Sequence, residues 1–136
     1  MVELSPPEEG PVPVTNKEKI ARAHEQSVSF NIADTARFLQ DVLGQRLTAY
    51  IAKIKDPRTV GTWATGQNKP RQDAEDRLRH AQMIVHLLQG DESVHVVRAW
   101  FVGLNPQLND EPPADAIREG RFKEALTAAR AFIAGG

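Results

Sequence analysis

Apolar residues recur three or four positions apart along most of this chain, which is the spacing of one face of an α-helix. The clearest stripe runs through Ile32, Ala36, Leu39 and Leu43. Gly44 follows it and has the backbone freedom that a helix end requires. The stripe therefore predicts a helix that begins near residue 32 and ends at this glycine.

Further stripes divide the rest of the chain into short helices separated by glycine and proline. The helices predicted after residue 70 are Gln72–Gln89, Val94–Val102, a short helix from Pro113 to Gly120, and Phe122–Ala134. The second of these is apolar on most sides, so we expect it to be buried. No alternating strand pattern and no internal repeat occurs. The pattern predicts an all-α protein of seven or eight short helices.

The first residues differ in composition from the rest of the chain. Residues 1–14 contain four of the nine prolines and show no helical period, so we expect a disordered or loosely attached arm. Thr15 and Glu18 have the spacing of a capping box and predict a short helix that ends near Glu25. We therefore divide the chain into an arm (1–14), a helical module (15–90) and a C-terminal helical module (91–136).

Composition and charge narrow the functional classes. Of the 136 residues, 40% are hydrophobic and 26% are charged, which is typical of a soluble globular protein. The net charge is −1, yet residues 37–80 carry nine Lys and Arg against five Asp and Glu, so we expect any contact with a polyanion there. The sequence has no apolar run long enough to cross a bilayer and no secretion signal. We expect a cytoplasmic protein without membrane contact.

The residues needed for catalysis or metal binding are not found in recognisable patterns. The chain has no cysteine, which excludes a disulfide, a thiol nucleophile and a cysteine-based metal site. Its four histidines lack metal-binding spacing, and no phosphate-binding loop or nucleophile motif occurs. We therefore expect a protein that is not an enzyme and has no cofactor and no metal.

Two short predicted helices with a tight connection form the first candidate site. Leu47–Ile54 and Pro57–Ala64 are each about two turns long and are joined by two residues, which is typical of a helix-turn-helix. In that motif the second helix enters a DNA major groove. Its apolar residues would face inward and its polar residues outward, toward DNA. The candidate DNA-binding residues are Lys53, Lys55, Arg58, Thr59, Thr62, Lys69 and Arg71.

The string LTAYIAKIKDPRTVGTWATGQNKP resembles the helix-turn-helix of the Xre/Cro-type repressor family. The matching features are the Ile51-Ala52 pair, Thr59-Val60, Trp63 and the exit from Gly66 to Pro70. The string departs from the family pattern in having a glycine at 61 inside the second helix and no glycine at turn residues 55 and 56. The alternative is a packing unit of a helical domain with solvated lysines.

The segment VRAWFVGLNPQLNDEPPADAIREGRFKEALTAARAFI, residues Val97–Ile133, carries a second signature. It includes Trp100, Asn105-Pro106 followed by Leu108, and Gly120 before the last helix. Proline stops a helix at Asn105, and we expect Leu108 to anchor this turn against a buried Trp100. The segment looks like the Xre/MbcA/ParS toxin-binding domain of bacterial antitoxins, which follows a Xre-like module in that family.

This resemblance implies a function and a partner. It implies a type II antitoxin that neutralises a NAD-degrading toxin with a RES domain by covering its active site, and that can also bind operator DNA to regulate its own expression. We expect a homodimer within a hetero-oligomeric toxin–antitoxin complex. The candidate toxin-binding residues are Arg118, Glu119, Arg121, Lys123, Arg130, Phe132, Ile133 and Gly136. The alternatives are a stand-alone transcriptional regulator with a C-terminal dimerisation module, and an adaptor domain without a DNA role.

Overall fold

The computed structural model describes residues 15–29, 31–90 and 92–135, and over these residues all the regular elements are helices. This confirms the predicted all-α class. The predicted arm, residues 1–14, and the candidate residue Gly136 lie outside the described residues. The elements are α1 (Asn16–Ser29), α2 (Ile32–Leu43), α3 (Gln45–Ala52), α4 (Arg58–Ala64), α5 (Gln72–Gln89), α6 (Val94–Val102), the 3₁₀ turn η1 (Pro106–Leu108), α7 (Pro113–Arg118) and α8 (Phe122–Ile133).

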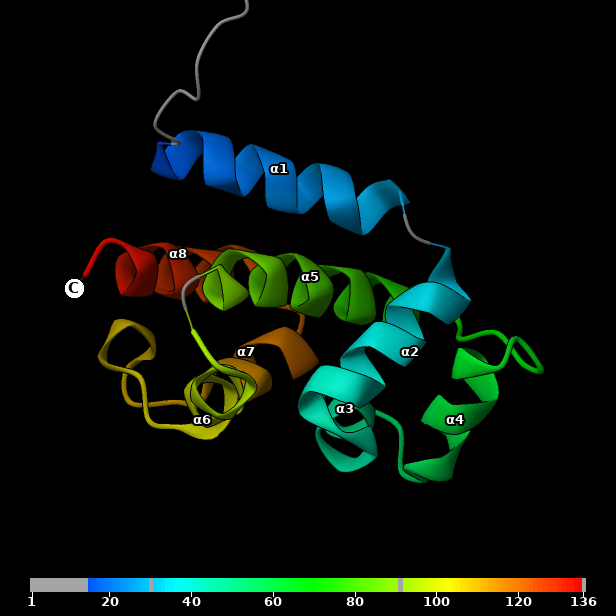
Figure 1. Cartoon of the computed structure of the whole chain (residues 1–136). Coiled ribbons are helices and arrows are strands. Elements are labelled where there is room, and N and C mark those ends of the chain that lie inside the picture. The colour runs from blue at the N-terminus through cyan, green and yellow to red at the C-terminus, as the bar shows by residue number, and fades with distance from the viewer. Residues whose placement is uncertain (1–14, 30, 91, 136) are drawn as a thin grey trace, which may run out of the picture.

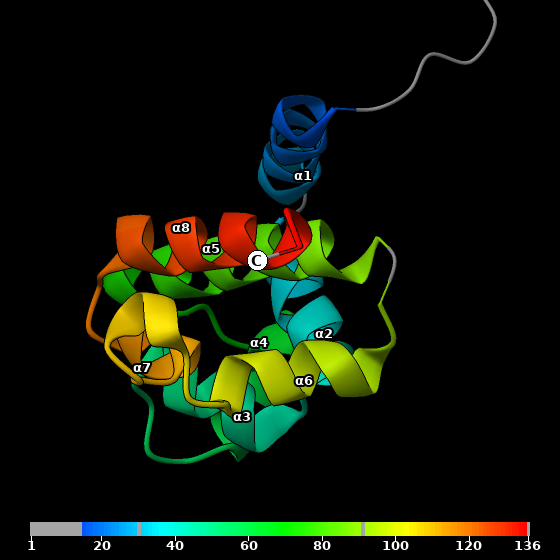
Figure 2. The ribbon, with the colours of Figure 1, turned by 90° about the vertical axis from the view of Figure 1, so that its left-hand side faces the viewer.

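Helix α5 lies at the centre of the fold. It packs against α1, α2, α3, α6, α7 and α8, and half of its residues are buried. Figure 2 shows α8 alongside α5, with α6 and α7 on the side of this pair opposite to α1. The buried apolar residues form one cluster that extends from Ala36 in α2 to Ala129 in α8. The two predicted helical modules therefore contribute to a single hydrophobic core.

Local capping sets the ends of several helices, and the predicted capping box at Thr15 and the predicted end at Gly44 are both present. The amide of Glu18 donates to Thr15 Oγ1 at 3.1 Å, and the Thr15 amide donates to the Glu18 carboxylate at 3.4 Å, which completes the capping box. Asn31 caps α2 through its side-chain oxygen, and Ser93 caps α6 in the same way. Gly44 ends α2 with a φ of 86°. Helix α1 extends to residue 29, beyond the predicted end near residue 25, because it packs along α5.

The core position predicted for Trp100 belongs instead to its neighbour Phe101. Helix α6 buries Val97 and Phe101, which are four residues apart and lie on one face of the helix. Trp100 lies at the edge of the core and is half-buried, with its ring edge-to-face against that of Phe101 at 5.1 Å between centroids. Leu108 is buried as expected, and η1 packs against α8. Phe101 is therefore the aromatic anchor of the C-terminal segment.

The expectation that the segment 94–102 is buried holds for only one of its faces. Val102 keeps 57% of its surface exposed, and Leu104, two residues further along, keeps 76%. Val96 is also exposed. The reason is that α6 packs against α2, α5 and α7 on one side and has no helix against its other side within the described chain. We call Val96, Val102 and Leu104 the α6 apolar surface.

None of the described helices combines the length and the apolar character that crossing a bilayer requires.

The burial of Phe101 predicts a large and specific effect on stability. Phe101→Ala should lower the free energy of unfolding by about 3–5 kcal/mol, because it leaves a cavity in the shared core. Val102→Ala, at the neighbouring exposed position, should change it by no more than about 0.5 kcal/mol. Urea denaturation followed by circular dichroism measures both values. A larger loss for Trp100→Ala than for Phe101→Ala would contradict this assignment.

Candidate functional site

The connection between α3 and α4 is longer than the sequence predicts. Helix α3 ends at residue 52, two residues earlier than predicted, because Lys53 adopts a left-handed conformation with a φ of 65°. The amide of Ile54 then donates to the carbonyl of Ala49 at 2.9 Å, and that of Lys53 donates to the carbonyl of Tyr50 at 3.1 Å. These bonds form a Schellman motif, in which glycine is the usual left-handed residue. The position that favours glycine is therefore residue 53 and not residues 55 and 56.

Helix α4 packs against α2 and α3 with the face that the sequence predicts. Val60, Trp63 and Ala64 are buried. A Cβ atom at Gly61 would lie 3.1 Å from Nε2 of Gln45 and 3.8 Å from Oε1 of Gln40, which are the ends of two flexible side chains. A side chain at residue 61 would therefore begin toward these glutamines of α3 and α2. The departure of Gly61 from the repressor pattern takes no side chain from the outer face of α4.

The structure leaves most of the predicted DNA-binding cations exposed. Helix α4 lies at one edge of the molecule, and the loop of residues 65–71 extends beyond its end (Figure 1). Thr59 and Thr62 are half-buried, and the Thr62 hydroxyl donates to the Thr59 carbonyl at 2.6 Å. Lys53 lies 4.0 Å from a carboxylate oxygen of Glu119 in the turn after α7. The exposed cations that flank α4 are Lys55, Arg58, Lys69 and Arg71.

Asp56, in the turn before α4, holds the side chain of Arg58. The Asp56 carboxylate accepts hydrogen bonds from Arg58 Nε at 3.1 Å and from Arg58 Nη2 at 3.0 Å. It also accepts from the backbone amide of Arg58 at 2.9 Å. These hydrogen bonds lower the pKa of Asp56, so its carboxylate is charged at neutral pH. The sequence placed Arg58 among the candidate DNA-binding residues but did not place Asp56 among them.

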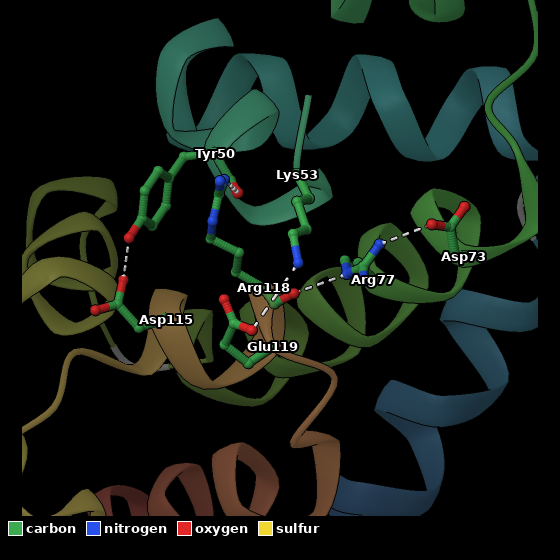
Figure 3. Close-up of polar contacts among 7 residues, drawn as sticks. All are labelled: Tyr50, Lys53, Asp73, Arg77, Asp115, Arg118 and Glu119. Atoms are coloured by element: carbon green, nitrogen blue, oxygen red, sulfur yellow. Dashed lines mark hydrogen bonds and ion pairs between the residues drawn. The ribbon is translucent and has the colours of Figure 1, made fainter. Parts of the chain in front are cut away.

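A cluster of polar contacts joins the end of α3 to α7 (Figure 3). The guanidinium of Arg118 lies over the ring of Tyr50, 4.5 Å from its centroid, and Arg118 Nη1 donates to the Tyr50 carbonyl at 2.7 Å. The carbonyl of Arg118 accepts from Arg77 Nε of α5 at 2.9 Å. The Tyr50 hydroxyl donates to the Asp115 carboxylate. We call these residues the Tyr50 junction: Tyr50, Lys53, Arg77, Asp115, Arg118 and Glu119.

The contacts of the Tyr50 junction raise the pKa of the tyrosine hydroxyl. The hydrogen bond to Asp115 is the main cause that raises the pKa of Tyr50, and partial burial adds to it. The charge of Asp115 acts in the same direction because it opposes a second negative charge nearby. Tyr50 therefore stays protonated in its role as a donor to α7.

The predicted toxin-binding residues divide into two groups in the structure. Arg118 and Glu119 contact α3 through the Tyr50 junction, and Arg121 pairs with Glu111 and Glu124. Arg118 and Glu119 thus join the C-terminal segment to α3, while Arg121 makes its ion pairs within that segment. The remaining described residues lie along α8, where Lys123 and Arg130 are exposed while Phe132 and Ile133 are half-buried against the core. The α6 apolar surface was not among the predicted contact residues.

The two histidines of α5 stack on aromatic rings. His80 stacks on Phe122 at 3.9 Å between ring centroids, and its Nδ1 lies 2.8 Å from the Asp76 carbonyl. His86 stacks on Phe38 at 4.7 Å, and burial lowers its pKa. Within the described residues, no three His, Asp or Glu side chains gather in a group that could hold a metal ion.

Comparison of this chain with protein-family models, with curated proteins and with solved structures finds no match.

The Tyr50 junction makes a testable prediction, because Tyr50 is the only tyrosine of the chain. It should titrate above its ordinary pKa of about 10, and Asp115→Asn should shift the titration back toward that value by removing the charged acceptor. A native pKa above the unfolded one stabilises the fold fully below about pH 10, and this contribution is lost as pH rises through the native pKa. The ultraviolet absorbance of tyrosinate measures the titration. Asp110→Asn is the control and should leave the midpoint of the Tyr50 titration unchanged. The same unchanged midpoint in Asp115→Asn would contradict the hydrogen bond between Tyr50 and Asp115.

Proposed function

We propose that this protein is the antitoxin of a type II toxin–antitoxin pair, which binds operator DNA through α3 and α4 and its toxin through the C-terminal segment. It acts by binding and not by catalysis. The observation that carries the DNA-binding part is the orientation of α4, which buries Val60, Trp63 and Ala64 and leaves the side chain of Arg58 88% exposed at the edge of the molecule. This is the orientation that a recognition helix needs to enter a major groove.

The exposed positive charges on both sides of α4 also support the proposal that DNA binds there. Lys55 lies in the connection before α4, and Lys69 and Arg71 lie in the segment after it, so exposed cations flank the helix at both ends. Cations in such positions can neutralise phosphates on both sides of a groove while the helix contacts base edges. The acidic balance of the rest of the chain favours this part of the molecule as the contact with a polyanion.

The toxin-binding part of the proposal rests on the resemblance of residues 97–133 to the toxin-binding domain of antitoxins. The residues of the α6 apolar surface are consistent with it, because their large apolar side chains remain exposed and a protein partner could cover them. Lys123 and Arg130 add exposed positive charge on α8. The partner that the resemblance implies is a RES-domain toxin that degrades NAD, whose cleft these residues would cover.

A second candidate function is a stand-alone DNA-binding regulator. The α6 apolar surface favours it equally well, because a second copy of the chain could cover Val96, Val102 and Leu104. A dimer formed in this way would present two copies of α4 to two DNA half-sites. The two candidates share the DNA surface and differ in what the C-terminal segment binds.

The DNA part predicts a steep dependence of binding on salt. Lys55→Ala combined with Lys69→Ala should weaken binding to the promoter fragment of the protein's own gene, and should reduce the slope of log K against log salt by about one unit for each lost phosphate contact. Titration of a labelled duplex at several salt concentrations measures both. Lys123→Ala on α8 is the control for loss of a cation away from α4. A wild-type protein that does not bind the fragment would contradict DNA binding.

The toxin part is tested by reversing exposed charge on α8. Deletion of α8 is unsuitable because Ala125, Ala128 and Ala129 belong to the shared core. Lys123→Glu with Arg130→Glu leaves those residues in place and should weaken binding to an adjacently encoded RES-domain toxin by roughly tenfold or more. The effect is measured as the affinity of the variant for the toxin and as the rescue of cell growth while the toxin is expressed.

The control for this test is Lys55→Glu, which reverses a charge beside α4 and should leave neutralisation of the toxin intact. Failure of the wild-type protein to bind or neutralise that toxin would refute the antitoxin assignment. The regulator would then remain as the function that the DNA surface supports.

A further inference from the structure

We propose that Asp56 is a positioning residue that holds Arg58 for end-on recognition of a guanine. This inference rests on the proposed binding of DNA through α3 and α4 and assigns the base contact of that surface. It gives Asp56 a role in sequence specificity without direct contact between its side chain and DNA.

The geometry of the pair determines which edge of the guanidinium is available. Arginine carries five N–H groups in a rigid planar fork. The Asp56 carboxylate occupies the side of the fork formed by Nε, at 3.1 Å, and Nη2, at 3.0 Å. The end of the fork, with one N–H on Nη1 and one on Nη2 pointing in parallel, lies away from the carboxylate. Two parallel donors match the O6 and N7 acceptors that guanine presents in the major groove.

The carboxylate itself is tied to the start of α4. It accepts from the backbone amide of Arg58 at 2.9 Å, and the backbone carbonyl of Asp56 accepts from the amide of Thr59 at 3.0 Å. The direction of the Arg58 side chain is therefore coupled to the axis of the recognition helix. A free arginine loses considerable side-chain entropy when it is ordered at an interface, and part of this loss occurs here before DNA is bound.

The Asp56–Arg58 ion pair also gives Arg58 a different role from that of the neighbouring lysines. Arg58 would contact a base, whereas the lysines would contact phosphates. Asp56 offsets the positive charge of Arg58, so the pair as a unit attracts phosphate less than an isolated cation does. Lys55 and Lys69 are exposed ammonium groups on flexible stems, which suits contacts with phosphates. Arg58 is 88% exposed whereas Asp56 is 46% exposed, so the arginine extends further into solvent than the carboxylate that holds it. We infer that Arg58 contributes to sequence discrimination and little to the salt dependence of binding.

The experiment uses the full chain and a library of randomised duplex DNA. The wild-type protein selects its preferred duplex, and its affinity is then compared with that for duplexes in which each guanine is replaced in turn. We expect one guanine in each half-site whose replacement weakens binding by the order of tenfold to a hundredfold. Arg58→Lys, which keeps the charge but has no planar fork, should lose this discrimination.

The decisive variant is Asp56→Asn. Its amide oxygen can still accept from the Arg58 amide, so the start of α4 is retained and circular dichroism should match that of the wild type. It should still bind DNA, while discrimination at the guanine falls several-fold. The slope of log K against log salt should steepen by up to about one unit, because the freed Arg58 then binds phosphate. Glu124→Gln is the matched control, since it removes a carboxylate from another arginine pair on α8.

The outcomes separate this inference from the function on which it rests. If the wild-type protein enriches no sequence and binds no duplex, the DNA-binding function is wrong and the inference with it. If the wild type enriches a site and Asp56→Asn keeps both its guanine discrimination and its salt slope, Asp56 does not position Arg58 although DNA binding stands. Loss of discrimination at an unchanged overall fold supports the inference.

Discussion

The burial of α5 along most of its surface is the constraint on which the rest of the structure depends. Leu78, Ala81, Ile84, Val85 and Leu88 are inaccessible to solvent or nearly so, and they make contact with helices that come before and after α5 in the chain. A helix with buried apolar residues on several sides is stable only when neighbours cover those sides. Because α2, α3, α6, α7 and α8 all pack against α5, the candidate DNA-binding helix and the C-terminal segment take their positions from the same helix.

The Tyr50 junction is the second link between these parts. Arg118 at the end of α7 contacts both the ring and the carbonyl of Tyr50 in α3, and its own carbonyl is held by Arg77 of α5. The left-handed Lys53 beside it places the following turn and thereby the start of α4. The end of α3, which leads into the candidate recognition helix, is thus contacted by a side chain 68 residues beyond Tyr50.

Two parts of the protein surface differ in their exposed side chains. Around α4 these side chains include the cations Lys55, Arg58, Lys69 and Arg71, which would suit a polyanion. Around α6 they include large apolar residues, which suits the surface of another protein. A net charge of −1 conceals this arrangement because the charges of opposite sign lie in different parts of the chain. The Asp56–Arg58 pair adds a planar and oriented donor group to a surface whose other cations are mostly flexible.

Local patterns in the sequence suffice to predict the helical class, most helix boundaries, the capping box of Thr15 and Glu18, and the inward face of α4. These features depend on residues within one or two turns of each other, so a local pattern contains them. The packing of the helices determines that Phe101 and not Trp100 enters the core, that one face of α6 stays exposed, and that Arg118 contacts α3. The type of a residue indicates whether its side chain needs an apolar or a charged neighbour. It does not indicate which distant segment provides that neighbour, because the partner depends on how the helices pack around α5.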